Sequence, residues 1–210
     1  MLIYPNNKIE KELYHRGFRG VAGLDEAGRG AWAGPVVAAA VVLPQNLKIK
    51  GLKDSKLLTP RKREELFIVI NKQALAVGVG IISEQVIDKE GIIAATRQAF
   101  LIAIEKIKDR VDYLLADGIK IFEHALPTEF HIKGDRKILS VAAASVVAKV
   151  TRDNILKDYH QKYPVYGFDQ HKGYGTSEHE RKLDQHGWCI IHRQSFRPIA
   201  EGRWAENREE

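Results

Sequence analysis

The sequence predicts an α/β protein with a mixed sheet, and three features of its pattern point to that class. Near the start of the chain, short apolar segments rich in Val and Ala are bounded by Gly and Pro, which is typical of strands. Only residues 26–34 separate the first two segments, and so short a connection favours an antiparallel pair. Long segments with helical spacing follow and enclose one more apolar segment, which completes an α/β order of elements.

Three strands and a helix are expected in the first half of the chain. The first two strands are predicted over residues 18–25 and 35–43, where the apolar runs lie. Thr59 is the expected N-cap of a helix over residues 60–74, because a proline follows it at the first helical position. The third strand is predicted over residues 74–82.

The second half is expected to be mainly helical. Ser83 is the expected cap of a short helix, and a capping box that begins at Ser177 opens another, with Gly187 as its stop. The one strand of this half ends in an Asp-Gly step at Asp117. The predicted elements are helices over residues 83–89, 92–108, 138–163 and 177–185, and a strand over residues 112–116.

The composition is that of one globular domain. The 210 residues are 44% hydrophobic and 29% charged, with an N-terminal extension over about residues 1–17 and a loose polar tail over about residues 200–210. The formal charge of +6 and the pI near 9.3 favour a polyanionic partner. Cys189 is the only cysteine, which excludes an intramolecular disulfide and zinc-finger spacing.

Neither a membrane span nor an export signal is predicted. The apolar runs are far shorter than the roughly 20 residues that a span needs. Residues 1–8 lack the positively charged start and apolar core of a signal peptide. We therefore expect a cytoplasmic protein without membrane contact. We also expect it to act as a monomer.

Asp25 and Glu26 are adjacent carboxylates at the end of the first predicted strand. Their charges repel and both resist desolvation, so their placement is costly unless a divalent cation lies beside them. Oxygen ligands of this kind suit Mg²⁺ or Mn²⁺. Because consecutive strand residues face opposite ways, the two can share a metal site only where the strand bends or ends.

A glycine-rich loop follows the two carboxylates. Gly28, Arg29 and Gly30 offer main-chain N–H groups and a guanidinium, which match phosphate and sugar oxygens. Together with the carboxylates, this loop indicates a site that handles a metal and a phosphate.

Two further carboxylates are candidates for the same site. Asp117 is expected at the C-terminal end of a strand, the edge where ligands gather in open α/β sheets. Asp153 lies on the predicted 138–163 helix, one turn after Lys149. The alternative interpretation of Asp153 is a solvated helix charge beside Arg152.

In combination, these motifs resemble those of the ribonuclease HII family. The resemblance runs in family order from about residue 20 to residue 198, so it spans nearly the whole chain. Ala31 and Trp32 stand where other members often carry Pro and an aliphatic residue. The matching stretches are residues 25–30 (Asp-Glu-Ala-Gly-Arg-Gly), 33–36, 54–56 (Asp-Ser-Lys), 116–118 (Ala-Asp-Gly), 140–153, 171–176 and 192–196.

The resemblance implies a ribonuclease H-like fold: a mixed five-stranded sheet flanked by helices, with a helical C-terminal extension. It implies an endonuclease that cleaves the RNA strand of RNA–DNA hybrids and nicks duplex DNA at embedded ribonucleotides, leaving 5′-phosphate and 3′-hydroxyl ends. Two divalent ions, Mg²⁺ or Mn²⁺, would act in the catalytic complex.

The resemblance also implies roles for individual residues. The Gly-Arg-Gly loop would sense the ribose 2′-hydroxyl, and Tyr174 would stack on the sugar of the neighbouring deoxynucleotide. The implied catalytic and metal-binding residues are Asp25, Glu26, Asp117 and Asp153, and the implied substrate-binding residues are Gly28, Arg29, Gly30, Tyr174, Lys56 and Lys149.

Two other interpretations of the motifs are weighed against this one. The glycines of residues 28–34 loosely fit a dinucleotide-binding pattern, but that pattern must open a helix and here a strand follows. A non-catalytic hybrid-binding protein would keep the fold, but all four acidic positions are filled. The histidines outside the family motifs are interpreted as surface or packing residues: His15, His124, His131, His160, His179 and His186.

Overall fold

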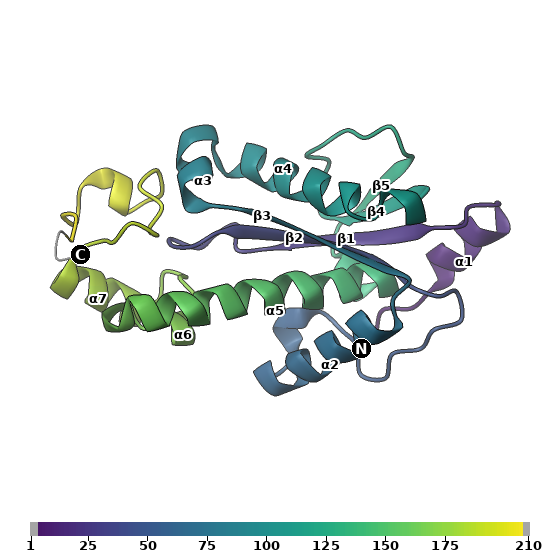
Figure 1. The fold of residues 1–210 in the computed structure, drawn as a ribbon, viewed down its shortest axis with the longest axis horizontal. Helices are drawn as coiled ribbons and strands as arrows, with labels where there is room; N and C mark the ends of the chain where they lie inside the picture. Colours follow the sequence, from purple (N-terminus) through teal and green to yellow (C-terminus); the bar gives the residue numbers. More distant parts are fainter. Residues whose placement is uncertain (1–3, 208–210) are drawn as a thin grey trace.

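The computed structural model describes residues 4–207, which form a sheet between two layers of helices (Figure 1). The strands are β1 (Val21–Ala27), β2 (Val36–Val42), β3 (Ala76–Ile82), β4 (Tyr113–Asp117) and β5 (Thr128–His131). The helices are α1 (Lys8–His15), α2 (Pro60–Gln73), α3 (Glu84–Glu90), α4 (Ile92–Glu105), α5 (Leu139–Lys162), α6 (Phe168–His171) and α7 (Ser177–His186). Within the described chain, no helix has both the length and the apolar character needed to cross a bilayer.

The strand order is β3-β2-β1-β4-β5. β1 pairs antiparallel with β2, and β2 pairs antiparallel with β3. On the other side, β1 pairs parallel with β4, and β4 pairs parallel with β5. The sheet is therefore mixed and five-stranded, which confirms the predicted fold class.

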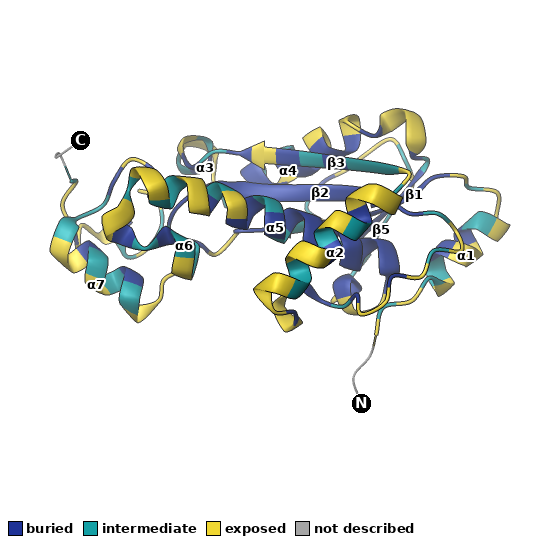
Figure 2. Ribbon diagram, turned by 60° about the horizontal axis from the view of Figure 1, so that its bottom comes forward, coloured by how far each residue is buried: buried dark blue, intermediate teal, exposed yellow. Residues whose placement is uncertain are grey.

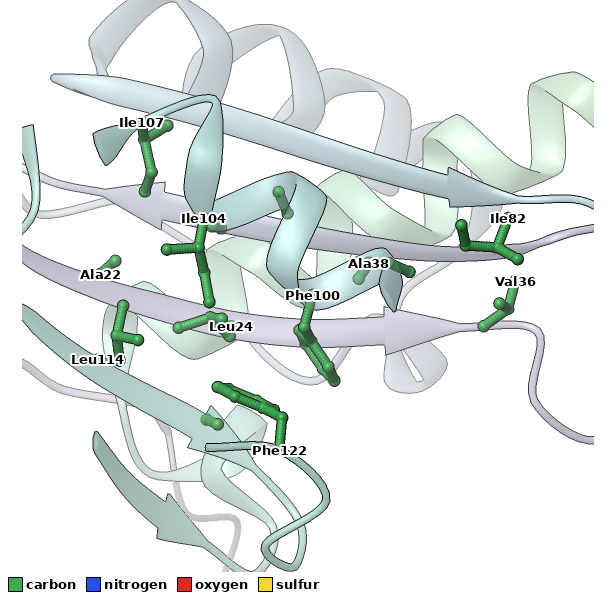
Figure 3. Packing of buried hydrophobic residues seen from close by; sticks show 14 of the residues in the cluster. Ala22, Leu24, Val36, Ala38, Ile82, Phe100, Ile104, Ile107, Leu114 and Phe122 are labelled. Atoms are coloured by element: carbon green, nitrogen blue, oxygen red, sulfur yellow. The ribbon is translucent and has the colours of Figure 1, made fainter. Parts of the chain in front are cut away.

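Helices cover both faces of this sheet. α3 and α4 lie on one face, and α2 and α5 lie on the other (Figure 1). Between the sheet and α4, Leu24 and Ala38 pack with Phe100 and Ile104 (Figure 3). Burial of such apolar surface stabilises the layers by about 25 cal/mol per Å². β2 is buried along its whole length because both of its faces are covered (Figure 2).

α5 packs tightly against β1. A Cβ atom at Gly23 would lie 2.1 Å from the carbonyl carbon of Ser140, so no larger residue fits there unless the helix moves. The first turns of α5 carry small side chains, which permit the same close approach. This contact places the helix directly beneath the end of β1 that carries Asp25.

The predicted strands and long helices are all present, with ends that shift by a few residues. Thr59 caps α2 as expected, because its hydroxyl accepts the Lys62 N–H at 3.3 Å. α1, α6 and β5 are elements that were not predicted from the local pattern. β5 has only four residues, Thr-Glu-Phe-His, all of them half-buried, so it shows none of the apolar alternation that marks a strand.

One predicted cap is wrong, and a second lies where expected but lacks its side-chain hydrogen bond. Thr176 is the N-cap of α7, since its hydroxyl accepts the His179 N–H at 3.2 Å, and Ser177 is the first helical residue. With Thr176 at the N-cap, the third helical residue is His179 and not a Glu or Gln, so the predicted capping box does not form. Ser83 occupies the N-cap position of α3, but its side chain makes no capping hydrogen bond.

The C-terminal part of the chain packs on the far end of α5. α6, α7 and the segment after them lie together at one end of the molecule (Figure 1). Leu156 of α5 packs there with Phe168 and Trp204. Because Trp204 is buried, the expected loose tail is wrong at least as far as residue 207. His179 is also buried in this region, which confirms its interpretation as a packing residue.

Candidate active site

Three carboxylates from separate elements meet at one end of the sheet. Asp25 lies in β1, Asp117 ends β4, and Asp135 lies in the turn before α5. β1 and β4 are parallel neighbours, so their C-terminal ends lie side by side. One oxygen of each carboxylate lies within 4.8 Å of the other two. The predicted proximity of Asp25 and Asp117 is therefore confirmed.

Electrostatic repulsion acts within this group. Burial raises the pKa of Asp25 well above its usual value of 3.8, and the charges of Glu26 and Asp117 add to the effect. Burial likewise raises the pKa of Asp135 to about 6, with further contributions from Asp117 and Asp54. A divalent cation would offset this repulsion, and carboxylate oxygens are the donors that Mg²⁺ and Mn²⁺ prefer. The residues present therefore fit such an ion.

Glu26 lines the same pocket as Asp25. The predicted strand end at Asp25 is wrong, because β1 continues to Ala27 and both acidic residues are strand residues. The Glu26 carboxylate is 15% exposed and pairs with Arg29 at 3.1 Å. Burial raises the pKa of Glu26, Arg29 opposes that rise, and the charge of Asp117 adds to it. Glu26 therefore lines the pocket beside the acidic group, and its carboxylate is affected by the charge of Asp117.

Lys56 brings a cation to the acidic group. Its turn is held by Asp54, a buried residue that accepts the Lys56 N–H at 2.9 Å and pairs with Arg136 at 3.1 Å. Burial lowers the pKa of Lys56, but the surrounding carboxylates raise it more, so that the net shift is upward. Those carboxylates are Asp25, Asp54, Asp135 and Asp117.

The structure does not bring Asp153 into the group formed by Asp25, Asp117 and Asp135, so the predicted meeting of Asp153 with the other carboxylates is not seen. The Asp153 carboxylate lies 2.6 Å from Lys149 and 3.9 Å from Arg63. The position of Asp153 along α5 explains this separation. Ser145 of α5 hydrogen-bonds Asp25, and Asp153 lies eight residues later, about 12 Å further along the helix axis. The alternative of a solvated charge is also wrong, because Asp153 is 7% exposed.

The predicted substrate-binding residues lie together. Tyr174 is held over two cations of α5, with its ring centroid 5.6 Å from Lys149 Nζ and 5.3 Å from Arg152 Cζ. Gly28 has φ +98°, and a Cβ atom there would lie 2.1 Å from Arg152 Nε. Together with Asp25 and Glu26, one pocket is lined by Gly28, Arg29, Gly30, Lys56, Lys149 and Tyr174.

Asp135 is the candidate that the sequence did not reveal. Its neighbour Gly134 donates its N–H to Asp117 Oδ1 at 2.6 Å, which fixes the turn against the end of β4. In the sequence, Gly-Asp-Arg reads as an ordinary turn before a helix. The one available signal is that an acidic residue stands shortly before a helix whose first turns carry small side chains. That signal alone does not indicate a metal site.

Comparison with known proteins agrees with this geometry. A family model described as ribonuclease HII matches residues 22–199. Ribonuclease HII of Acetivibrio thermocellus is 52% identical over 187 residues, covering 89% of this chain and 73% of that protein. Ribonuclease HII of Bacillus mycoides is 50% identical over 193 residues, covering 92% of this chain and 75% of that protein.

Solved structures show the same fold. The ribonuclease H2 of Pyrococcus horikoshii has a TM-score of 0.73 at 27% identity, covering 87% of this chain and 96% of its own. The ribonuclease HII in a PCNA complex from Archaeoglobus fulgidus has a TM-score of 0.72 at 24% identity, covering 88% of this chain and 97% of its own. The chain therefore belongs to the ribonuclease HII family, metal-dependent endoribonucleases that cleave the RNA of RNA–DNA hybrids.

Proposed function

We propose that this protein hydrolyses the RNA strand of RNA–DNA hybrids and also nicks duplex DNA at single embedded ribonucleotides. The observation that carries the proposal is the acidic group of Asp25, Asp117 and Asp135 beside the Gly-Arg-Gly loop. Such a pocket combines oxygen ligands for divalent ions with a main chain that a sugar can approach closely. The ribose 2′-hydroxyl is the group that distinguishes RNA from DNA at such a site.

Asp25, Glu26, Asp117 and Asp135 are the proposed ligands of two divalent ions, Mg²⁺ or Mn²⁺. When bound, the ions would neutralise charge on the phosphate and lower the pKa of the attacking water. Asp117 is already oriented by the Gly134 N–H, so it needs little rearrangement to bind. Hydrolysis then breaks the bond between phosphorus and the 3′ oxygen, leaving 5′-phosphate and 3′-hydroxyl ends.

Gly28, Arg29 and Gly30 are the proposed readers of the 2′-hydroxyl, and Tyr174 is the proposed platform for the neighbouring deoxyribose. A sugar without a 2′-hydroxyl can lie closer to the flat ring. Asp153 acts indirectly in this scheme. Its ion pair with Lys149 holds that lysine against Tyr174.

Three substrates test the proposal: a DNA duplex with one ribonucleotide, a continuous RNA–DNA hybrid and an all-DNA duplex. With Mg²⁺ or Mn²⁺, we expect cleavage of the first two and not of the third. Asp117→Asn should abolish both cleavages and weaken Mg²⁺ binding in calorimetry, whereas Asp109→Asn, at an exposed carboxylate, should change neither.

Two results would contradict the proposal. Cleavage of the hybrid without nicking at the single ribonucleotide would restrict the function to hybrids. Full activity with a metal chelator present, or in Asp117→Asn, would overturn the role of the acidic group.

A further inference from the structure

Arg152 and Arg193 are fully buried, each with 0% exposure. Burying a guanidinium is costly unless its N–H groups find partners. Each of the two makes three side-chain hydrogen bonds, and all of them end on main-chain carbonyls rather than on carboxylates. A buried cation that binds only main-chain oxygens holds segments of the chain in place.

Arg152 joins two loops of the candidate site. Its Nε and Nη2 atoms donate to the carbonyls of Pro35 and Ala33, both at 2.9 Å, in the loop that follows β1. Its Nη1 atom donates to the carbonyl of Lys172 at 2.9 Å, in the loop that carries Tyr174. The same guanidinium therefore spans the Gly-Arg-Gly loop and the Tyr174 loop and also lies under the tyrosine ring.

Arg193 fastens the first of these loops from the C-terminal part of the chain. Its Nε and Nη2 atoms donate to the Gly34 carbonyl at 2.9 and 2.8 Å, and its Nη1 atom donates to the Arg29 carbonyl at 3.0 Å. Its own N–H donates to the Trp32 carbonyl at 2.7 Å. The central residue of Gly-Arg-Gly is thus held through its main chain, while its side chain pairs with Glu26 at the wall of the pocket.

We propose that Arg152 and Arg193 are positioning residues that set the distance between the Gly-Arg-Gly loop and Tyr174, and that this distance makes the site select a ribonucleotide next to a deoxynucleotide. The inference rests on the proposed function, because it assumes that both loops contact the nucleotides at the cleavage site.

Only arginine fits these contacts. A planar guanidinium presents several N–H donors in a rigid fork, so one side chain can reach carbonyls in different directions. A lysine ammonium is a compact point charge that is more strongly hydrated, and it cannot reproduce the same three contacts. Arg→Lys therefore keeps the charge but releases the loops from one another.

Arg152→Lys and Arg193→Lys test the proposal on the single-ribonucleotide duplex and the continuous hybrid. We expect kcat at the single ribonucleotide to fall on the order of 100-fold, because misplacement of a positioning group by about 1 Å has that effect. The continuous hybrid offers no deoxyribose to Tyr174 on the cleaved strand, so its kcat should fall much less. Affinity for an all-DNA duplex should not change, since phosphate charge dominates that binding.

A double-mutant cycle separates positioning from general stability. In a Tyr174→Ala background, Arg152→Lys should reduce kcat at the single ribonucleotide by no more than about twofold, because the distance it sets no longer matters. Arg97→Lys, at an exposed position of α4, is the matched control and should behave as wild type. Thermal unfolding is recorded for each variant, and Arg193→Lys carries the test if Arg152→Lys does not fold.

Equal losses on both substrates, or an undiminished loss in the Tyr174→Ala background, would make the two arginines merely structural and overturn the inference. Variants that behave like Arg97→Lys, while wild type nicks at the single ribonucleotide, would also overturn it and leave the proposed function intact. Failure of wild type on that duplex would overturn the proposed function and the inference with it.

Discussion

Asp135 and Asp153 carry the same charge in opposite electrostatic surroundings. Burial and the charges of Asp117 and Asp54 raise the pKa of Asp135 to about 6. Asp153 lies instead between Lys149 and Arg63, which already balance its charge. A divalent ion therefore relieves repulsion at Asp135 and would only displace existing partners at Asp153.

We expect Asp135→Asn to abolish cleavage and to weaken Mg²⁺ binding measured by calorimetry. The unfolding temperature of the metal-free variant should rise, because one of the repelling charges is removed. Asp153→Asn should leave Mg²⁺ binding unchanged and lower kcat by roughly tenfold or less, about 1.4 kcal/mol, since it only frees Lys149. Equal loss of Mg²⁺ binding in the two variants would return Asp153 to the metal site.

Gly28 and Gly30 differ in what a side chain would meet. Alanine at Gly28 would collide with Arg152, whereas a Cβ atom at Gly30 meets no atom within 4 Å among residues 4–207. Gly30→Ala should change the free energy of unfolding by no more than about 0.5 kcal/mol. It should still reduce nicking at a single ribonucleotide, because the methyl group would occupy the pocket in which we propose that the sugar binds.

Binding to an all-DNA duplex is the control for that experiment and should be unchanged in Gly30→Ala. Gly28→Ala should lose both stability and nicking. If Gly30→Ala nicks as fast as wild type, close approach of the main chain to the sugar is not required.

At the level of elements, α5 carries Lys149 and Arg152, so its position governs much of the site. Its N-cap, Ile138, offers no side-chain oxygen. The cap comes from α1 instead, where Glu10 Oε1 accepts the N–H of Ser140 at 2.9 Å and its hydroxyl at 3.0 Å. A carboxylate at this place also interacts favourably with the helix dipole. The N-terminal helix is therefore part of the structure that positions the site.

Glu10→Ala is expected to lower the free energy of unfolding by about 1–2 kcal/mol, the usual cost of losing a helix cap. Glu10→Gln should cost less, because its amide oxygen can still accept from Ser140. Urea denaturation measures both, with Glu12→Ala, at an exposed position of the same helix, as the control. Equal stability of Glu10→Ala and Glu12→Ala would show that the cap contributes nothing.

At the level of the whole molecule, a buried histidine pair links the C-terminal segment to the Tyr174 loop. The carbonyl of Tyr174 can only accept, so His179 Nδ1 donates to it at 3.0 Å. His192 Nε2 then donates to His179 Nε2 at 3.0 Å, and the Cys189 N–H donates to His192 Nδ1 at 3.0 Å. This chain of hydrogen bonds requires that both rings be neutral.

Burial lowers the pKa of His179 to about 3 and that of His192 to about 4, from a usual 6.5. Between pH 6.5 and about 4 the unfolded chain binds protons that the folded chain does not, so the pair contributes stability that is lost as pH falls. When the pH is lowered from 7 to about 4.5, the free energy of unfolding should therefore fall by about 2 kcal/mol less in His179→Gln than in wild type.

The comparison between variants is needed because buried carboxylates with raised pKa values, such as Asp25, act in the opposite direction and are common to both proteins. Denaturant unfolding at the two pH values gives the difference, with His15→Gln, at an exposed histidine, as the control. A pH-independent difference between wild type and His179→Gln would show that folding does not lower the pKa of His179.

Features that depend on a local pattern of residues can be predicted from the chain alone. Thr59 followed by proline predicts the start of α2, and apolar runs between Gly and Pro predict β1 to β3, because caps and periodicity act over a few residues. Carboxylates at the ends of two predicted strands likewise indicate that Asp25 and Asp117 lie close together if those strands are neighbours, and the parallel pairing of β1 with β4 meets that condition. Motifs in a fixed order indicate the family, and the family model and curated relatives confirm it.

Which other side chains share that site depends on contacts between segments that are far apart in the chain. Asp135 lies beside Asp117 because the Gly134 N–H donates a hydrogen bond to Asp117 at the end of β4. Asp153 lies about two turns further along α5 than the residue that contacts Asp25, and so it is outside the acidic group. β5 forms through pairing with β4 and not through any apolar pattern of its own. Arg152 is a charged residue in the middle of a helix, and nothing in the sequence shows that it is buried. Its guanidinium can be buried because it donates to three main-chain carbonyls from two distant loops. Such contacts join residues far apart in the chain, and no local pattern records them.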